Sequence, residues 1–341
     1  MSASQSWGIA WILLGGFLSG SFALPMKRML GWRWENTWLV YALFAMVVLP
    51  WAWAGVTVPQ LGLVYRQAPV STLAAVALFG LGWGVGATLF GLGIDRVGMA
   101  LGFAVILGIS ASFGALLPLA ILQPAQLATR QGMALLTGMA TVILGIILCA
   151  HAGRLRERET SPSTETPGRS GFGWGLIICI FSGIFSAMLN FGFVFGKKLQ
   201  EVTLSLGAGP AMSANSLWSL TLTAGFVANA AYCVYLLRRN RSWSLFSKPQ
   251  SPTKCWLGGV LMGLLWFSGV VTYGIGASRL GPLGGSLGWP LYMAMLIITA
   301  NVWGAMTGEW KGASRRSSGY AWLGMAVLVA AIYVISSQST G

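Results

Sequence analysis

The chain has 341 residues, of which 55% are hydrophobic and only 8% are Asp, Glu, Lys or Arg. Soluble domains carry about 25% charged residues, so this composition excludes an ordinary soluble fold. The net charge of +14 does not indicate nucleic-acid binding, because the basic residues lie between hydrophobic segments and form no stripe interleaved with exposed aromatics.

Ten segments of at least 23 residues contain no charged side chain, and each is long enough for the about 20 apolar residues that cross a bilayer as a helix. They are 1–26, 36–65, 67–94, 97–129, 131–153, 170–196, 202–237, 255–278, 280–308 and 317–341. A membrane barrel would show short alternating segments, and a soluble protein with buried helices would show one or two such runs. The sequence therefore predicts an all-α polytopic membrane protein with ten transmembrane helices.

The first segment does not resemble a cleavable signal peptide, because its positive charges, beginning with Lys27 and Arg28, follow it rather than precede it. Sixteen of the 21 Lys and Arg residues lie in the connections after the odd-numbered segments. Cytoplasmic loops carry the excess of positive charge, so we expect these connections to be cytoplasmic and both termini to be periplasmic. The implied location is the bacterial inner membrane.

The longest polar stretch, 154–170, divides the segments five and five, and its charged, Ser/Thr/Pro-rich composition predicts a cytoplasmic linker. A shift of 183 residues aligns eight Gly, Trp and Arg positions of the third and fourth segments with the eighth and ninth. These positions run from Gly80 and Trp83 to Gly102, and from Gly263 and Trp266 to Gly285. We therefore predict two inverted five-helix repeats, 1–153 and 171–341, a recurring architecture of secondary transporters.

No arrangement of residues indicates catalysis. The hydrophobic segments contain no acid pair and no nucleophile beside a base. The four cysteines have no paired spacing that would suggest a disulfide or a metal site, and the single histidine, His151, lies at the end of a segment. We expect no enzyme activity, no metal and no organic cofactor.

Neutral hydrogen-bonding and aromatic side chains lie within the hydrophobic segments, and they suit a neutral polyhydroxylated ligand such as a sugar. Our candidate substrate-binding residues are Trp83, Thr88, Ser110, Ser186, Asn190, Asn215, Trp266, Tyr273, Trp289, Tyr292 and Asn301. The alternative for each amide is a hydrogen bond to a neighbouring helix. We expect the first, third, fourth, sixth, eighth and ninth segments to surround the cavity.

Carboxylates are scarce, and none lies in the middle of a segment. Glu35 and Glu309 stand at predicted cytoplasmic ends, next to Trp34 and Trp310. Either residue is a candidate for carrying a coupled proton. A salt bridge, to Arg33 or to Lys311, is an equally good interpretation.

Several motifs along the whole chain resemble the L-rhamnose–proton symporter family of the drug/metabolite transporter superfamily. They include Trp32-Arg-Trp34-Glu35-x-Thr37-Trp38, Phe79-Gly80-x-x-Trp83-Gly84-x-Gly86, Ser286-Leu-Gly-Trp289-Pro290 and, most specifically, Asn301-x-Trp303-Gly304-x-x-x-Gly308-Glu309-Trp310-Lys311. The resemblance implies uptake of a deoxyhexose with protons as the coupling ion. Some members carry an acidic residue just before the position of Trp289, where this chain reads Gly284-Gly285-Ser286.

These observations lead to one functional hypothesis and two alternatives. The first is import of L-rhamnose or a similar neutral deoxy-sugar with protons by alternating access, with membrane lipids as the surroundings. The second is export or exchange of another small metabolite on the same scaffold. The third is a membrane scaffold or sensor without transport.

Overall fold

The computed structural model describes residues 3–29, 31–160, 172–247 and 252–337, and these parts of the chain form helices and no strands. The long helices are α1 (Ala3–Ser21), α5 (Val70–Val97), α6 (Met99–Leu122), α7 (Arg130–Thr160), α8 (Phe172–Phe195), α10 (Asn215–Arg239), α11 (Pro252–Arg279), α12 (Gly284–Met306) and α13 (Arg315–Ser337). Short helices and turns connect them: η1 (Pro25–Arg28), α4 (Leu61–Gln67), η3 (Pro124–Ala128), α9 (Lys197–Ser205), η4 (Pro210–Met212), η5 (Trp243–Phe246) and η6 (Gly281–Leu283).

The second span is interrupted. It consists of α2 (Trp34–Leu43), a π-helical turn η2 (Phe44–Val48) and α3 (Leu49–Thr57). Pro50 at the start of α3 has no backbone N–H, so the regular hydrogen-bond ladder cannot continue through this point. A wider π-helical turn is a common local response to such a break.

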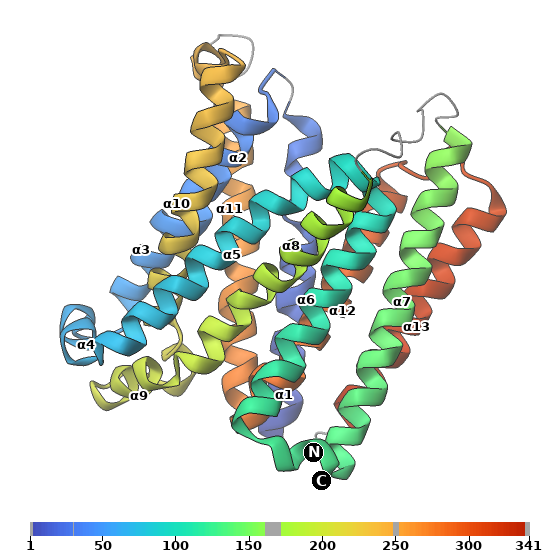
Figure 1. The fold of residues 1–341 in the computed structure, drawn as a ribbon. Helices are drawn as coiled ribbons and strands as arrows, with labels where there is room; N and C mark the ends of the chain where they lie inside the picture. Colours follow the sequence, from blue (N-terminus) through green and yellow to red (C-terminus); the bar gives the residue numbers. More distant parts are fainter. Residues whose placement is uncertain (1–2, 30, 161–171, 248–251, 338–341) are drawn as a thin grey trace.

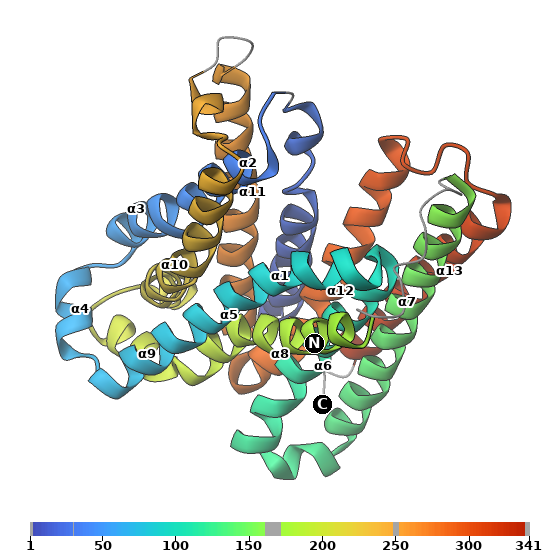
Figure 2. The ribbon, with the colours of Figure 1, turned by 45° about the horizontal axis from the view of Figure 1, so that its top comes forward.

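Ten helical segments within the described residues are long and apolar enough to cross a membrane, which confirms the predicted number. α7 and α13 lie side by side at one edge of the bundle, and α2, α3 and α10 lie at the opposite edge (Figures 1 and 2). α12 is the most buried of the ten spans. The chain is a multi-pass membrane protein.

The two halves of the chain exchange packing partners. α1 packs against α11 and α12 of the second half, and α8 packs against α5 and α6 of the first half. α1 rises and α8 descends in the view of Figure 1, so the first helices of the two predicted repeats run in opposite directions. Two inverted repeats would produce this pattern.

Glycine allows the close contact between α1 and α11. A Cβ atom on Gly15 would lie 2.7 Å from the carbonyl oxygen of Gly269, and a Cβ atom on Gly269 would lie 2.7 Å from the carbonyl oxygen of Gly15. Since apolar burial gives no drive between helices in lipid, close backbone packing of this kind is what holds them together.

α1, α5, α7, α10 and α12 all end at the same end of the bundle, the upper end in Figure 1. We call it the basic end, because Lys27, Arg96, Arg156, Arg238 and Arg315 lie there. α1 begins and α13 ends at the opposite end. The first seven residues of the predicted linker, 154–160, continue α7 as helix, and the rest of it lies outside the described residues.

Candidate functional site

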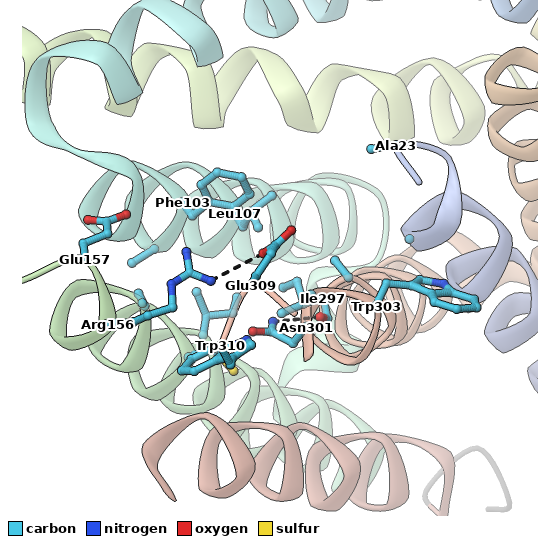
Figure 3. A pocket seen from close by; sticks show the side chains of 18 of the residues that line it. Ala23, Phe103, Leu107, Arg156, Glu157, Ile297, Asn301, Trp303, Glu309 and Trp310 are labelled. Atoms are coloured by element: carbon cyan, nitrogen blue, oxygen red, sulfur yellow. Dashed lines mark hydrogen bonds and ion pairs between the residues drawn. The ribbon is translucent and has the colours of Figure 1, made fainter. Parts of the chain in front are cut away.

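A cavity of about 350 Å³ lies near the basic end, between α1, α6, α7 and α12. Its volume falls within the range of about 300–1,000 Å³ that is typical of small-molecule sites. The walls are mainly apolar, with Phe103 and Leu107 on α6 facing Ile297 on α12, and polar side chains gather toward the mouth (Figure 3). Of the spans predicted around a cavity, the first, fourth and ninth line this one; α7, the fifth span, also lines it, whereas α5, α8 and α11 do not.

Glu309 is the centre of a charged cluster at the mouth of the cavity. Lys27, from η1, forms an ion pair with one carboxylate oxygen of Glu309 and also donates a hydrogen bond to Thr307. The other carboxylate oxygen accepts from Arg156 of α7 at 3.4 Å. Arg156 also lies over the ring of Trp310, 5.1 Å from its centroid. Three separate parts of the chain therefore meet at one carboxylate, which is itself partly exposed.

Two neutral side chains of α12 line the cavity below this cluster. The indole N–H of Trp303 donates to the hydroxyl of Ser21 at 2.7 Å, which fixes the ring against α1. Asn301 donates to the carbonyl oxygen of Ile297 at 2.9 Å. Among the described residues, its amide oxygen accepts no hydrogen bond, so it can accept one from a ligand hydroxyl.

Asn190 is the centre of a polar network buried between four helices. Its amide nitrogen donates to the carbonyl oxygens of Gly114 on α6 (2.8 Å) and Gly285 on α12 (3.1 Å). Its amide oxygen accepts from the hydroxyl of Tyr273 on α11 at 2.5 Å. Asn190 is fully buried, and this network ties helices of both halves together on the side away from the basic end.

Aromatic rings extend the same network. Trp289 donates to the carbonyl oxygen of Ser110 at 2.9 Å and stacks on Tyr292, with ring centroids 5.7 Å apart. Tyr292 in turn donates to the hydroxyl of Ser19 on α1 at 2.7 Å. The structure thus brings five predicted site residues together: Ser110, Asn190, Tyr273, Trp289 and Tyr292. All five are buried in this arrangement.

The remaining predicted residues lie elsewhere. Trp83 and Trp266 stack on each other with centroids 5.3 Å apart, a contact between positions that the 183-residue shift aligns. Thr88 donates to the carbonyl oxygen of Gly84 in its own helix, and Asn215 donates to Thr57 at the end away from the cavity. Ser186 lies half-buried on α8. Asn301 is the only predicted substrate-binding residue among the described ones that lines the 350 Å³ cavity.

Glu35 and Glu309 have different surroundings. Glu35 is buried at the start of α2 and accepts hydrogen bonds from Ser242 (2.6 Å) and Asn240 (3.0 Å), which connect α2 to the end of α10. The two residues lie near the same end of the bundle, but only Glu309 lines the cavity.

Three residues that line the cavity were not among the predicted site residues: Lys27, Arg156 and Trp303. Trp303 lies in the most specific run of the family resemblance, between Asn301 and Glu309, so that motif contained a signal for it. Lys27 and Arg156 were counted only among the basic residues of the connections, which predicted the orientation in the membrane. Their meeting at Glu309 depends on contacts over 282 and 153 residues, which no local pattern indicates.

Comparison with known proteins gives a consistent result over the whole chain. The model of a family described as L-rhamnose-proton symport protein matches residues 1–339. The chain is 28% identical to the L-rhamnose-proton symporter of Escherichia coli O1:K1, covering 98% of both chains. It is also 28% identical to the symporter of the same name from Salmonella gallinarum, covering 100% of both, and 27% identical to that of Citrobacter koseri.

Proposed function

Because the chain belongs to the L-rhamnose-proton symport protein family, we propose that it imports L-rhamnose or a closely similar deoxy-sugar together with protons. The observation that carries this proposal is the cavity between α1, α6, α7 and α12, which combines an apolar wall, a neutral amide and an ion-paired carboxylate. A sugar needs hydrogen-bond partners and an apolar face, and a coupled proton needs a titratable group. No catalytic reaction is part of this function.

The state of the molecule under this proposal is inward-facing. The cavity lies near the basic end, which we place in the cytoplasm on the positive-inside rule. The Asn190 network and the aromatic stack around Trp289 then close the periplasmic half. Both termini are periplasmic in this orientation, and the membrane is the bacterial inner membrane.

We assign substrate contact in the inward-facing state to Asn301 and Trp303. The amide oxygen of Asn301 accepts from a ring hydroxyl, and the indole of Trp303 offers a flat apolar face to the methyl-bearing side of the sugar. The buried candidates Asn190, Tyr273, Trp289 and Tyr292 exchange their helix-to-helix bonds for sugar hydroxyls only when the periplasmic half opens. The other predicted residues hold the surrounding helices together and do not contact the sugar: Thr88, Ser110, Ser186, Asn215, Trp83 and Trp266.

Proton coupling in this proposal runs through Glu309. In the inward-facing state the carboxylate of Glu309 is held by Lys27 and Arg156. Protonation would remove the negative charge that joins η1, α7 and the α12–α13 connection.

Uptake into proteoliposomes tests the proposal. We expect an imposed gradient, acidic outside, to increase accumulation of labelled L-rhamnose, and we expect collapse of the gradient by a protonophore to abolish the increase. Efflux stimulated by the opposite gradient, without uptake, would instead indicate an exporter. The proposal is wrong if the gradient has no effect and L-rhamnose does not raise the unfolding temperature of the purified protein.

A further inference from the structure

A second cavity, of about 640 Å³, lies on the other side of the α6–α7 pair from the first. Ala104 and Ala150 line both cavities, so these two small residues form part of the wall between them. The outer cavity is a groove that faces away from the bundle: Phe113 and Ile147, on its two walls, are 38% and 52% exposed. Side chains this apolar and this exposed face lipid when a helix crosses a membrane.

The groove changes from apolar to basic along its length. Val105, Ile109, Phe113 and Ile143 line its inner part, and His151 and Arg154 line it at the basic end. From Ile143 to Arg154, α7 rises roughly 16 Å at 1.5 Å per residue. One leaflet of hydrocarbon is about 15 Å thick, so the groove has the length of one lipid chain with the two basic side chains at the depth of the head group.

None of the ion pairs in the described segments includes Arg154, although its neighbour one half-turn on, Arg156, is paired with Glu309. The side chain is exposed at the mouth of the groove. Basic pockets between transmembrane helices on the cytoplasmic side are the usual sites for anionic lipid head groups.

We propose that the groove between α6 and α7 binds an anionic phospholipid from the cytoplasmic leaflet. The phosphate lies against Arg154 and His151, and one acyl chain runs down the groove toward Phe113. Ala104 and Ala150 lie between this acyl chain and the inner cavity. The bound lipid therefore supports the wall formed by α6 and α7, and α7 carries Arg156 of the charged cluster at Glu309. The site is independent of which sugar the protein carries.

Gly108 offers a direct way to block the groove. It lines the groove, and a Cβ atom built on it would meet nothing within 4 Å, so a larger side chain enters open space rather than another helix. Gly108→Leu should therefore fill the place of the acyl chain while leaving the fold intact. Arg154→Gln removes the head-group contact instead, and Arg158→Gln, one turn further along α7 and outside the groove, is the matched control.

The experiment titrates the full-length protein in detergent with phosphatidylglycerol and, separately, with phosphatidylcholine of the same acyl chains, and counts retained lipids by native mass spectrometry. We expect one tightly retained phosphatidylglycerol that phosphatidylcholine does not replace. Arg154→Gln should weaken its binding by about fivefold, Gly108→Leu should abolish it, and Arg158→Gln should change it less than twofold.

Three results would overturn the proposal: equal retention of the two lipids, unchanged phosphatidylglycerol binding in Gly108→Leu, or equal losses in Arg154→Gln and Arg158→Gln. A millimolar excess of inorganic phosphate separates the possible sources of the ligand. Displacement of the lipid by phosphate alone would mean that the site recognises a free anion, and this too would contradict a lipid site.

Discussion

Lys27 and Glu309 form an ion pair across the mouth of the 350 Å³ cavity, although they lie 282 residues apart in the chain. The pair joins η1, at the end of the first span, to the connection between α12 and α13. Glu309 is 44% exposed, and exposed ion pairs contribute only about 0–1 kcal/mol to stability. The pair is therefore more important for where it places a carboxylate than for the stability of the fold.

Replacement of Glu309 by Gln should separate coupling from transport. The amide cannot ionise near neutral pH, so we expect gradient-driven uptake of L-rhamnose to fall at least tenfold while exchange of labelled for unlabelled sugar continues. Glu201→Gln is the control, because within the described residues Glu201 forms its ion pair with Lys197 of its own helix, α9, away from the cavity. If Glu309→Gln still accumulates sugar in response to pH, Glu309 does not carry the coupled proton.

Glu35→Gln should have the opposite profile. Ser242 and Asn240 both donate to the same carboxylate oxygen of Glu35, so a glutamine keeps that acceptor but loses the negative charge that strengthens both bonds. We expect a loss of about 1–3 kcal/mol in stability, measured as a lower unfolding temperature in detergent, with an unchanged pH dependence of uptake. A folded variant that has lost its proton dependence would move the coupling role from Glu309 to Glu35.

The sequence predicted the ten spans because a span is a local property: a run without charge and long enough to cross lipid. It also placed Asn190 and Tyr292 within hydrophobic segments, and both side chains are buried. It could not predict their partners, because Asn190 bonds to the backbone of Gly114 and Gly285, groups that every residue carries.

The contact between Trp83 and Trp266 shows what a repeat can add. The 183-residue shift aligned the two residues, but alignment says only that they are equivalent, not that they touch. No repeat indicated that Lys27 and Arg156 would meet at Glu309. The three residues lie in different connections between the predicted segments, and the basic residues there were used only to predict orientation. Contacts between distant connections follow from helix packing, which the sequence pattern does not determine.

Asn190 and Asn301 should differ in what their removal costs. Asn190→Ala removes the bonds to the carbonyl oxygens of Gly114 and Gly285 and leaves the buried hydroxyl of Tyr273 without its acceptor, so we expect a loss of about 1–3 kcal/mol in stability. Asn301→Ala loses one bond within its own helix, so stability should change little, whereas the KM for L-rhamnose should rise about fivefold to tenfold. Equal effects of the two variants on unfolding temperature would contradict this division.

Gly15 and Gly91 both lie in transmembrane helices, but only Gly15 contacts another helix closely. We therefore compare Gly15→Ala with Gly91→Ala. A methyl group on Gly15 would lie 2.7 Å from the carbonyl oxygen of Gly269 and 2.9 Å from the hydroxyl of Thr272, so α1 and α11 must move apart. A methyl group on Gly91 would meet nothing within 4 Å. We expect Gly15→Ala to lower the unfolding temperature clearly. Gly91→Ala should leave it unchanged or raise it, since alanine favours a helix by up to about 1 kcal/mol over glycine.

The comparison of these two variants is informative because each adds the same single carbon atom. Thermal unfolding in detergent, followed by the recovery of monodisperse protein in size-exclusion chromatography, measures both. A stable Gly15→Ala variant would show that α1 and α11 can separate by a few tenths of an ångström without loss. The packing of the two halves would then depend on the Asn190 network and the Lys27–Glu309 pair rather than on this helix contact.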